Sequence, residues 1–316
     1  MELEEIVQAA KAGNAKYGER KWVLCPTSEY LNIVLFEMRE QLEQDGISIA
    51  TCEKALYHTL SNKASFRTYC EELGIQPPKL FSSEEERTVT PPFVAKPKNN
   101  LAKNGSILYP HLIRTAEEQH SFLHNADRDE FYLEEFVHGE SWYLLYYFSA
   151  DGSVISGAQR NYLQQGKGKS IVLARAEDYP EESVPYLFKE RLRRDGYRGF
   201  IMIELRRSAS GMATAIEANP RCWGPFQLTI DARMGLLEAF LKDHGTNAVT
   251  ASTGKRRATY SWLGGCLQAM RTGRSLDRHT DRSTLLGMIP SALANDVYAR
   301  RGTWRCFLSD LWRRAS

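Results

Sequence analysis

GFIMIELRR, at residues 199–207, is followed after a short turn by ATAIEANPR at residues 213–221. Both stretches are short, largely apolar and bounded by turn residues, which predicts two neighbouring strands. Glu204 interrupts the apolar run of the first stretch, and Glu217 and Asn219 lie two residues apart in the second. Side chains two apart on a strand share a face. The pattern therefore predicts three oxygen-bearing side chains that converge from adjacent strands.

Glu204, Glu217 and Asn219 are hard oxygen donors, the type that Mg²⁺, and equally Mn²⁺, takes when it bridges nucleotide phosphates. A second interpretation is that Glu204 pairs with Arg206 or Arg221 as a buried ion pair. Burying three such polar groups together without a cation is unfavourable. We therefore favour the prediction that all three side chains are metal ligands.

The chain before this pair of strands opens with an α/β pattern. A helix is expected over residues 2–19, a buried strand over Lys21–Pro26 and a helix over residues 28–44, with a further strand after the turn at Asp45-Gly46. Alternation of this kind predicts a small parallel sheet covered by helices. A helix over Asn62–Leu73 closes the region, stopped by Gly74 and Pro77-Pro78.

The middle of the chain is rich in strands. The stretch 76–92, with its Pro, Ser and Glu residues, is the linker candidate before it. Helices are expected near 115–124 and 181–195, and the chain from about residue 226 is expected to be mostly helical. The expected strands are Phe93–Pro97, Phe131–Val137, Ser141–Phe148, Val154–Ala158, Ser170–Ala174, Phe200–Leu205 and Ala213–Ala218.

Composition excludes several classes of protein. The chain has 316 residues, of which 42% are hydrophobic and 11% aromatic, enough for a large core in two or three lobes. Its 41 basic and 39 acidic residues give a net charge of +2, so nucleic acid is not an expected partner. No apolar run reaches the length of a membrane span. The six cysteines are scattered without a CxxC pair and the start lacks a signal peptide, which together favour the cytoplasm.

Two further segments are candidates for binding phosphate and base. Lys96, in the strand FVAKP, could lie over phosphate oxygens, with backbone N–H groups near Asn104, Gly105 and Ser106 of the following polar loop closing over them; Lys103 of this loop is counted with the nucleotide site. A lysine-rich surface turn is the alternative. In FYLEEFVHGESW (131–142), the backbone from Glu134 to Val137 could face an adenine edge; a plain hairpin is the alternative.

In this order the segments resemble the ATP-grasp superfamily of ligases, over roughly residues 20–245. The resemblance lies in Lys63 before Gly74-Ile-Gln-Pro-Pro78, in Lys96 with its loop, and in the hinge Glu134-Glu-Phe-Val-His-Gly139. It ends with Glu204 ahead of Glu217-Ala-Asn-Pro-Arg221, its most specific part.

The resemblance implies roles for these residues. Lys63 and Lys96 would contact ATP phosphates, Val137 would present its backbone N–H to adenine, and Arg221 would stabilise the acyl-phosphate. The hinge residues Glu134, Glu135 and Phe136 belong to the same nucleotide site. Many relatives carry a ribose-binding glutamate where this chain has Ser141, with Glu140 one residue earlier. Arg160 falls where relatives place residues that meet the acceptor, a solvated basic hairpin being the alternative.

The implied fold is an α/β (α+β) ATP-grasp fold in four parts: a reduced N-terminal α/β lobe (1–76), a central lobe (77–140), a C-terminal antiparallel lobe with the metal site (141–248) and a helical tail (249–316). The implied activity is an ATP-dependent ligation of a carboxylate to an amine through an acyl-phosphate, with a kinase, a carboxylase or a nucleotide-binding protein as alternatives. Because the first lobe is short, a homodimer is one way to complete its edge. The basic aromatic tail from Arg300 is expected to be a docking helix, with a membrane surface as the alternative.

Overall fold

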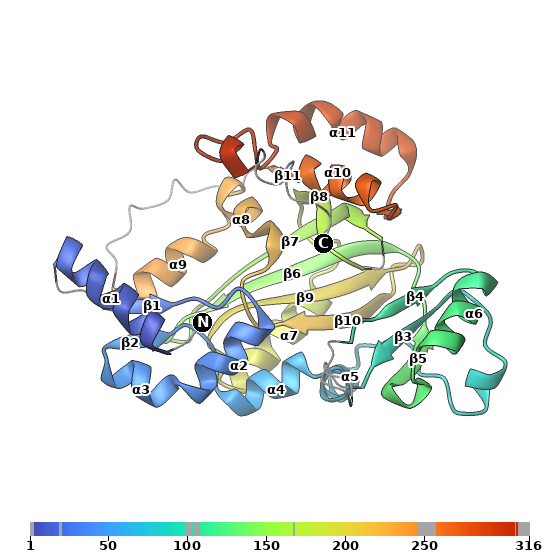
Figure 1. Ribbon diagram of the computed structural model, residues 1–316, viewed down its shortest axis with the longest axis horizontal. Helices are drawn as coiled ribbons and strands as arrows, with labels where there is room; N and C mark the ends of the chain where they lie inside the picture. The colour runs from blue at the N-terminus through green and yellow to red at the C-terminus, as the bar shows by residue number, and fades with distance from the viewer. Residues whose placement is uncertain are drawn as a thin grey trace.

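The computed structural model describes residues 3–18, 21–98, 103, 108–166, 168–245, 257–306 and 308. Within these ranges the strands form three sheets (Figure 1). The first is the parallel pair β1 (Trp22–Leu24) and β2 (Ile47–Ile49). Buried aliphatic side chains of α1 (Leu3–Tyr17), α2 (Glu29–Glu37) and α3 (Arg39–Gln44) pack against this pair. The predicted parallel sheet covered by helices is confirmed.

The second sheet is a small antiparallel one. Its order is β4 (His111–Ile113), β3 (Phe93–Pro97), β5 (Phe131–Glu135). The helix α6 (Ala116–Asn125) covers one face, because Phe122 packs into the cluster of Phe93, Ile113 and Phe131. Short 3-10 turns lie beside it at Glu85–Arg87 (η1) and Arg128–Glu130 (η2).

The third sheet is the largest, and all its pairings are antiparallel. In the part of the chain that the structure describes, its order is β10-β9-β6-β7-β8-β11, and β12 pairs with β7. The strands are β6 (Glu140–Phe148), β7 (Val154–Gln165), β8 (Ile171–Ala176), β9 (Gly199–Arg207), β10 (Ala213–Asn219), β11 (Thr259–Ser261) and β12 (Leu276–Arg278).

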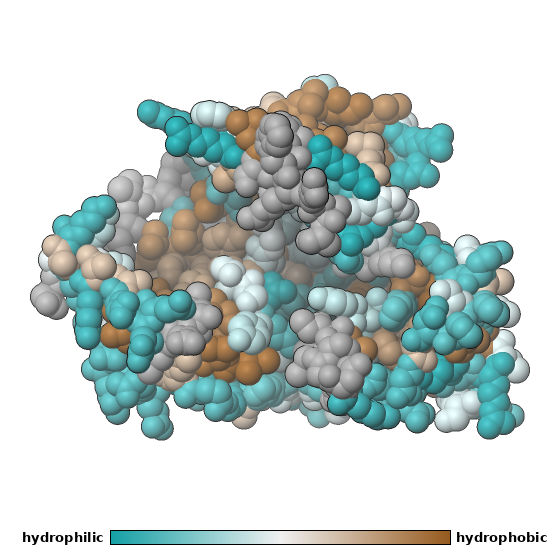
Figure 2. Space-filling view, viewed as in Figure 1, coloured by the Kyte–Doolittle hydropathy of each residue, from teal (hydrophilic) through white to brown (hydrophobic). Residues whose placement is uncertain are grey.

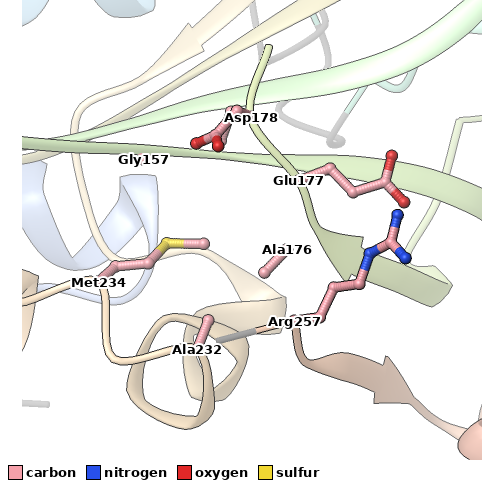
Figure 3. A pocket seen from close by; sticks show the side chains of 8 residues that line it. Gly157, Ala176, Glu177, Asp178, Ala232, Met234 and Arg257 are labelled. Atoms are coloured by element: carbon pink, nitrogen blue, oxygen red, sulfur yellow. The ribbon is translucent and has the colours of Figure 1, made fainter. Parts of the chain in front are cut away.

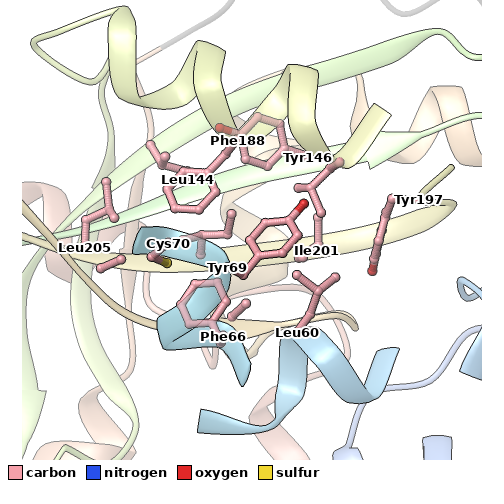
Figure 4. Packing of buried hydrophobic residues seen from close by; sticks show 14 of the residues in the cluster. Leu60, Phe66, Tyr69, Cys70, Leu144, Tyr146, Phe188, Tyr197, Ile201 and Leu205 are labelled. Atoms are coloured by element: carbon pink, nitrogen blue, oxygen red, sulfur yellow. The ribbon is translucent and has the colours of Figure 1, made fainter. Parts of the chain in front are cut away.

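Helices cover both faces of this sheet, and the core lies on each side of it. On one face, α4 (Lys54–Ser61), α5 (Lys63–Glu72) and α7 (Ser183–Arg194) bury aromatic and aliphatic side chains against β6 and β9 (Figure 4). On the other face, the 3-10 turn η3 (Gly224–Phe226), α8 (Gln227–Asp231) and α9 (Leu236–Asp243) pack on a second cluster that includes Tyr147, Phe200 and Trp223. Alternate residues of β6 and β9 therefore serve two separate clusters, as the period of a strand requires.

The C-terminal helices α10 (Leu263–Arg271) and α11 (Arg282–Ala294) lie beside β8 and β11 (Figure 1). The view in Figure 2 is hollowed between these helices and the lower part of the molecule, and apolar side chains gather at the top of the view, over α11. The exposed large apolar residues of α11 are Leu286, Ile289 and Leu293. Among the described helices, none combines the length and apolar character that a membrane span requires.

Several predicted elements need correction. The helix expected over 28–44 is divided at Met38, whose φ of −102° and ψ of 2° leave the helical region. No element was expected at 54–61, where α4 forms around buried Tyr57 and Leu60. The chain beyond residue 226 was expected to be mostly helical, yet it also contributes β11 and β12 to the large sheet.

Candidate functional site

A row of opposed side chains crosses one face of the large sheet. Glu217 of β10 is in register with Glu204 of β9. Glu204 is in turn opposite Tyr143 of β6, and Tyr143 is opposite Gln159 of β7. Directly opposed residues of antiparallel strands point to the same face. The two carboxylates proposed as metal ligands therefore lie side by side, with Tyr143 and Gln159 continuing the row.

Ile216 explains why the two carboxylates meet. The register steps from Ala215 directly to Glu217 while β9 advances by one residue, so Ile216 is the extra residue of a β-bulge. A bulge re-aims the side chains that follow it. Without the bulge, Ile216 would lie opposite Glu204, and Glu217 would point to the other face. The bulge brings both Glu217 and Asn219 to the face of Glu204.

The donor set of this cluster suits a hard divalent cation. Asn219 Nδ2 donates to Glu217 Oε1 at 2.7 Å, and Arg221 Nη2 donates to Asn219 Oδ1 at 2.9 Å. Within the described ranges, no three His, Cys, Asp or Glu side chains gather closely enough to hold a metal. The amide oxygen of Asn219 would be the third protein donor beside Glu204 and Glu217. Two carboxylates and an amide oxygen fit Mg²⁺.

Glu204 is buried in an environment that opposes its charge. Its side chain keeps a relative exposure of only 8%, and Oε1 accepts a hydrogen bond from Arg206 Nη2 at 3.0 Å. Burial raises the pKa of Glu204 to about 7; Arg206 opposes this shift and the charge of Glu217 adds to it. The ion pair between Glu204 and Arg206 is thus present, but it does not cancel the rise in pKa that burial causes. A bound divalent cation would stabilise both ionised carboxylates.

Lys96 connects the small sheet to the carboxylate cluster. Its side chain is buried, and Nζ lies 2.6 Å from Glu134 Oε1. Lys96 Nζ also donates to the carbonyl oxygen of Ile216, the bulged residue of β10, at 3.4 Å. Arg67 Nη2 is 3.7 Å from the other oxygen of Glu134. The predicted phosphate lysine and the first hinge glutamate therefore form a buried pair at the junction of the two sheets.

Lys63 approaches the same junction from a helix N-terminus. Asn62 caps α5 by accepting hydrogen bonds from the backbone N–H groups of the second and third helical residues, which fixes Lys63 at the first position. Burial lowers the pKa of Lys63, and the charge of Lys96 lowers it further, while Glu217 opposes the shift. Two lysines and the carboxylate cluster thus share one electrostatic environment, although they come from four different elements, α5, β3, β9 and β10.

A cavity of about 610 Å³ adjoins the hinge between β5 and β6. The hinge residues Phe136–Gly139 form one wall, and the segment 276–282 forms another. Arg206 also lines the cavity, and its Nη1 lies 2.9 Å from His279 Nδ1. Arg114, at the end of β4, forms an ion pair of 2.7 Å with Asp277 of β12. The cavity is thus polar and rich in arginine.

The structure does not bring Glu140 and Arg160 together with the carboxylate cluster. Arg160 Nη2 lies 2.6 Å from Glu140 Oε1, and Trp142 Nε1 donates to Glu140 Oε2 at 2.9 Å. Trp142 packs in the cluster covered by α4, α5 and α7. Because Arg160 is directly opposite Trp142, this group lies on the sheet face away from Glu204. Neither residue belongs to the candidate site as the structure forms it.

Other predicted residues lie at the margin of the site or outside the described ranges. Glu135 is exposed, whereas Phe136 and Val137 are half-buried at the hinge. Lys103 is exposed, and its Nζ forms an ion pair of 3.2 Å with Asp127. Asn104, Gly105 and Ser106 fall outside the residues that the structure describes.

The lining residues of the hinge cavity that were not predicted as site residues include Arg114, Arg206, Asp277 and His279. Arg206 entered only as an ion-pair partner of Glu204. The others come from β4 and from the segment around β12, far along the chain from the hinge. β6 pairs with β7 as far as Asn161, and β12 pairs with β7 at Leu163–Gln165. The segment around β12 therefore lies beside β7 just beyond the end of β6. No local sequence signal marks such a pairing.

A second, smaller cavity of about 350 Å³ lies near the start of β7 and the end of β8 (Figure 3). Met234 extends over Gly157, where an added Cβ would come within 2.6 Å of the Met234 sulfur. Acidic side chains and one arginine surround the remaining opening. The lining residues are Gly157, Ala158, Ala176, Glu177, Asp178, Ala232, Met234 and Arg257.

The small sheet set against a large antiparallel sheet, with lysines and carboxylates at their junction, defines a class of fold: the chain has the ATP-grasp fold. Solved structures with this fold resemble it closely enough to superpose over most of its length. The biotin carboxylase domain of Hydrogenobacter thermophilus 2-oxoglutarate carboxylase, crystallised with ADP, MgADP and bicarbonate, gives a TM-score of 0.56 at 15% identity, covering 79% of this chain and 58% of that one.

Two further structures resemble the chain to a similar degree. Campylobacter jejuni biotin carboxylase, in a β,γ-ATP complex, gives a TM-score of 0.56 at 12% identity over 80% of this chain and 60% of that one. The ADP complex of PurK, N5-carboxyaminoimidazole ribonucleotide synthetase, gives 0.54 at 14% identity over 76% and 66%. The chain thus spans less than two thirds of each of these chains. No family model and no curated protein matches its sequence.

Proposed function

We propose that the protein is an ATP-dependent carboxylate–amine ligase. In the first step, a carboxylate oxygen of the substrate attacks the γ-phosphorus of ATP, and the bond to the β,γ-bridging oxygen breaks to release ADP. In the second step, an amine nitrogen attacks the acyl carbon of the resulting acyl-phosphate, and phosphate leaves with the bonding electron pair. The products are an amide, ADP and phosphate.

One observation carries this proposal: Lys96 of the small sheet reaches the bulge of β10 that presents Glu217. Cationic and carboxylate groups from two sheets therefore meet at one junction. That combination suits a polyphosphate held by lysine and by carboxylate-bound metal. The fold supports the same conclusion, since the three similar structures described above were crystallised with ADP, MgADP or β,γ-ATP.

The residues would divide the work as follows. Glu204, Glu217 and Asn219 would hold Mg²⁺, which would offset charge on the transferring phosphoryl group. Lys63 and Lys96 would bind phosphate oxygens. Lys96 would either leave its ion pair with Glu134 or keep that ion pair while it binds phosphate. The cavity beside Phe136–Gly139 would take the adenosine end of the nucleotide, with the backbone N–H of Val137 toward adenine. Arg221, which donates to Asn219, would stabilise the acyl-phosphate.

A carboxylase is the second candidate, because one of the similar structures contains bicarbonate as well as ADP. In that case bicarbonate would be the carboxylate that attacks ATP, and carboxyphosphate would replace the acyl-phosphate. The two reactions share every residue named for the nucleotide. They differ in the carboxylate that attacks ATP. An assay can therefore distinguish them by whether bicarbonate alone supports release of ADP.

The test is ADP and phosphate release with ATP and Mg²⁺ across a panel of paired carboxylates and amines, with bicarbonate as a separate arm. We expect release that requires both a carboxylate and an amine. Glu217→Gln should lower that rate by at least 100-fold, since it removes one carboxylate from the metal set. Glu43→Gln, at an exposed position of α3, is the matched control and should retain the wild-type rate.

Three outcomes would decide against the ligase or against the metal assignment. Release with bicarbonate in the absence of an amine would favour the carboxylase. Transfer of phosphate to a stable hydroxyl product would favour a kinase. A fully active Glu217→Gln variant would contradict the metal assignment whichever substrate is used.

A further inference from the structure

Two cysteines that are 197 residues apart in the chain meet beside the candidate site. Cys25 follows β1, and Cys222 follows Arg221 directly. Their Sγ atoms are 3.3 Å apart. The backbone N–H of Cys222 donates to the carbonyl oxygen of Pro26 at 3.2 Å, so the two backbone segments are themselves held together. The sulfur contact is therefore built into the packing of the N-terminal sheet against the large sheet.

The two thiols are also chemically different. Both are half-buried rather than sealed in the core, so a small reagent can approach them. Either sulfur can donate in this contact. The contact with Cys222 lowers the pKa of Cys25, and the contact with Cys25 raises the pKa of Cys222. A thiolate is the form that attacks a disulfide. Cys25 is accordingly the nucleophile of the pair, and Cys222 is positioned to follow it.

We propose that Cys25 and Cys222 form a site of reversible oxidation, which closes as an internal disulfide by exchange with a low-molecular-weight disulfide. The Cys25 thiolate attacks one sulfur of the reagent, the reagent's S–S bond breaks, and one thiol is released. Cys222, after losing its proton, then attacks Sγ of Cys25 and releases the second thiol. The protein loses two electrons and two protons, and the reagent gains them as two thiols.

The bond would act on the candidate site through the backbone of Cys222. Arg221 Nη1 donates to the carbonyl oxygen of Cys222 at 2.9 Å, and Arg221 Nη2 donates to Asn219. A disulfide requires a sulfur–sulfur distance of about 2.05 Å, so the 3.3 Å contact must shorten by more than 1 Å. That shift would displace the carbonyl that holds Arg221. This consequence for turnover rests on the proposed function, whereas formation of the disulfide does not.

The experiment treats the folded full-length protein with oxidised glutathione and compares four chains: the wild type, Cys25→Ser, Cys222→Ser and Cys266→Ser. Cys266 is also half-buried, so the third variant is the matched control. Intact mass and a non-reducing digest are the readouts. We expect loss of two hydrogens and a Cys25–Cys222 cross-linked peptide in the wild type and in Cys266→Ser. Glutathione adducts alone, or a cross-link between other cysteines, would overturn the proposal.

Turnover is measured on the same samples. Oxidised wild type should release ADP at least five-fold more slowly than the reduced protein, with recovery on adding dithiothreitol, and Cys25→Ser should respond to neither reagent. A cross-link without a change in rate would overturn the coupling to Arg221. If the reduced protein shows no turnover with any substrate, the proposed function fails, and the cross-linked peptide still decides the oxidation site. Thermal unfolding of each serine variant confirms that it is folded.

Discussion

A chain of polar contacts links the carboxylate cluster to the hinge cavity. Arg206 donates to Glu204 and also contacts His279, and His279 Nε2 lies 3.1 Å from Gln164 Oε1. Arg206 can supply only donors, so the ring nitrogen of His279 that faces it must accept. Burial and, to a smaller extent, the charges of Arg206 and Arg114 together lower the pKa of His279 to about 3. The imidazole is therefore neutral in the folded protein at neutral pH.

Because His279 is neutral in the folded protein, the free energy of unfolding depends on pH in the acidic range. In the unfolded chain His279 has its ordinary pKa of 6.5, and in the folded protein it has a pKa of about 3. Between these values the unfolded state binds the extra proton, so stability falls as pH decreases through this window and is unaffected by the group above it. The loss from this histidine approaches about 1.4 kcal/mol for each pH unit. His279→Asn keeps an acceptor but cannot be protonated.

The measurement is urea unfolding of wild type and His279→Asn at pH 7.5, 6, 5 and 4. We expect the difference in unfolding free energy to shift in favour of the variant as the pH decreases. His120→Asn, at an exposed position of α6, is the control and should follow the wild-type curve. Parallel curves for wild type and His279→Asn would show that folding does not shift the pKa of His279.

At the scale of elements, local patterns predicted the strands that carry the carboxylates but not how those strands are aligned. The strand Phe93–Pro97 was predicted with its observed bounds, because β-branched and aromatic residues end there at a proline. The bulge at Ile216 was not predictable, since it depends on register with β9 rather than on local composition. Alternation on one strand placed Glu217 and Asn219 together, while their meeting with Glu204 required this bulge.

The face of a residue on a central strand was equally hard to predict. Glu140 and Arg160 lie within the segments that the family pattern marks, and the alternation of β6 and β7 still turns both away from Glu204. A shift of one residue in a strand changes its face. The assignments of metal ligands, phosphate lysines and hinge therefore remain predictions supported by the geometry, and those of Glu140 and Arg160 lose that support.

The hinge between β5 and β6 depends on one glycine, Gly139, which approaches the backbone of β9 closely. Gly139 has a φ of +142°, and a Cβ added there would lie 2.3 Å from the carbonyl oxygen of Arg207. That oxygen belongs to β9, directly opposite the first residue of β6, and cannot move without opening the sheet. Gly139→Ala should therefore cost about 3 kcal/mol or more, from overpacking in addition to backbone strain.

Gly152, in the turn between β6 and β7, provides the matched comparison. Its φ of +83° imposes backbone strain on an alanine, but an added Cβ would meet no atom within 4 Å. Gly152→Ala should cost about 1 kcal/mol. Urea unfolding of both variants separates strain from contact. Equal losses of unfolding free energy for the two variants would mean that the carbonyl group of Arg207 moves aside. The hinge would then not depend on the close approach of Gly139 to β9.

At the scale of the whole molecule, the C-terminal part of the chain belongs to the large sheet. β11 pairs with β8, and β12 pairs with β7. Tyr260 enters the same core cluster as Trp223, and Arg300 is ion-paired with Asp231 of α8. The division at residues 76, 140 and 248 remains a proposal about lobes. The region after residue 257 forms the helices α10 and α11, as its local pattern indicates, and also contributes β11 and β12 to the large sheet.

Truncations test how far that integration extends. A chain ending after residue 245 lacks β11, β12 and α11, so it loses the buried side chains of Tyr260, Ala269 and Met288 and leaves the edge of β8 unpaired. Each large apolar side chain contributes about 1.5–3 kcal/mol, and an uncovered strand edge promotes association. We expect this chain to be aggregated or to unfold at least 10 °C lower, a shift that corresponds to several kcal/mol for a protein of this size.

A chain ending after Gly302 is the control. It keeps every strand of the described sheets, and it retains Arg300 with its partner Asp231. Its melting temperature should lie within about 3 °C of the wild type, a change of about 1 kcal/mol at most. Differential scanning calorimetry with sedimentation velocity reports stability and association together. If the chain ending at residue 245 were monomeric and melted with the full-length protein, β11 and β12 would be accessory to the large sheet, and the hinge cavity would have to form without its wall at 276–282.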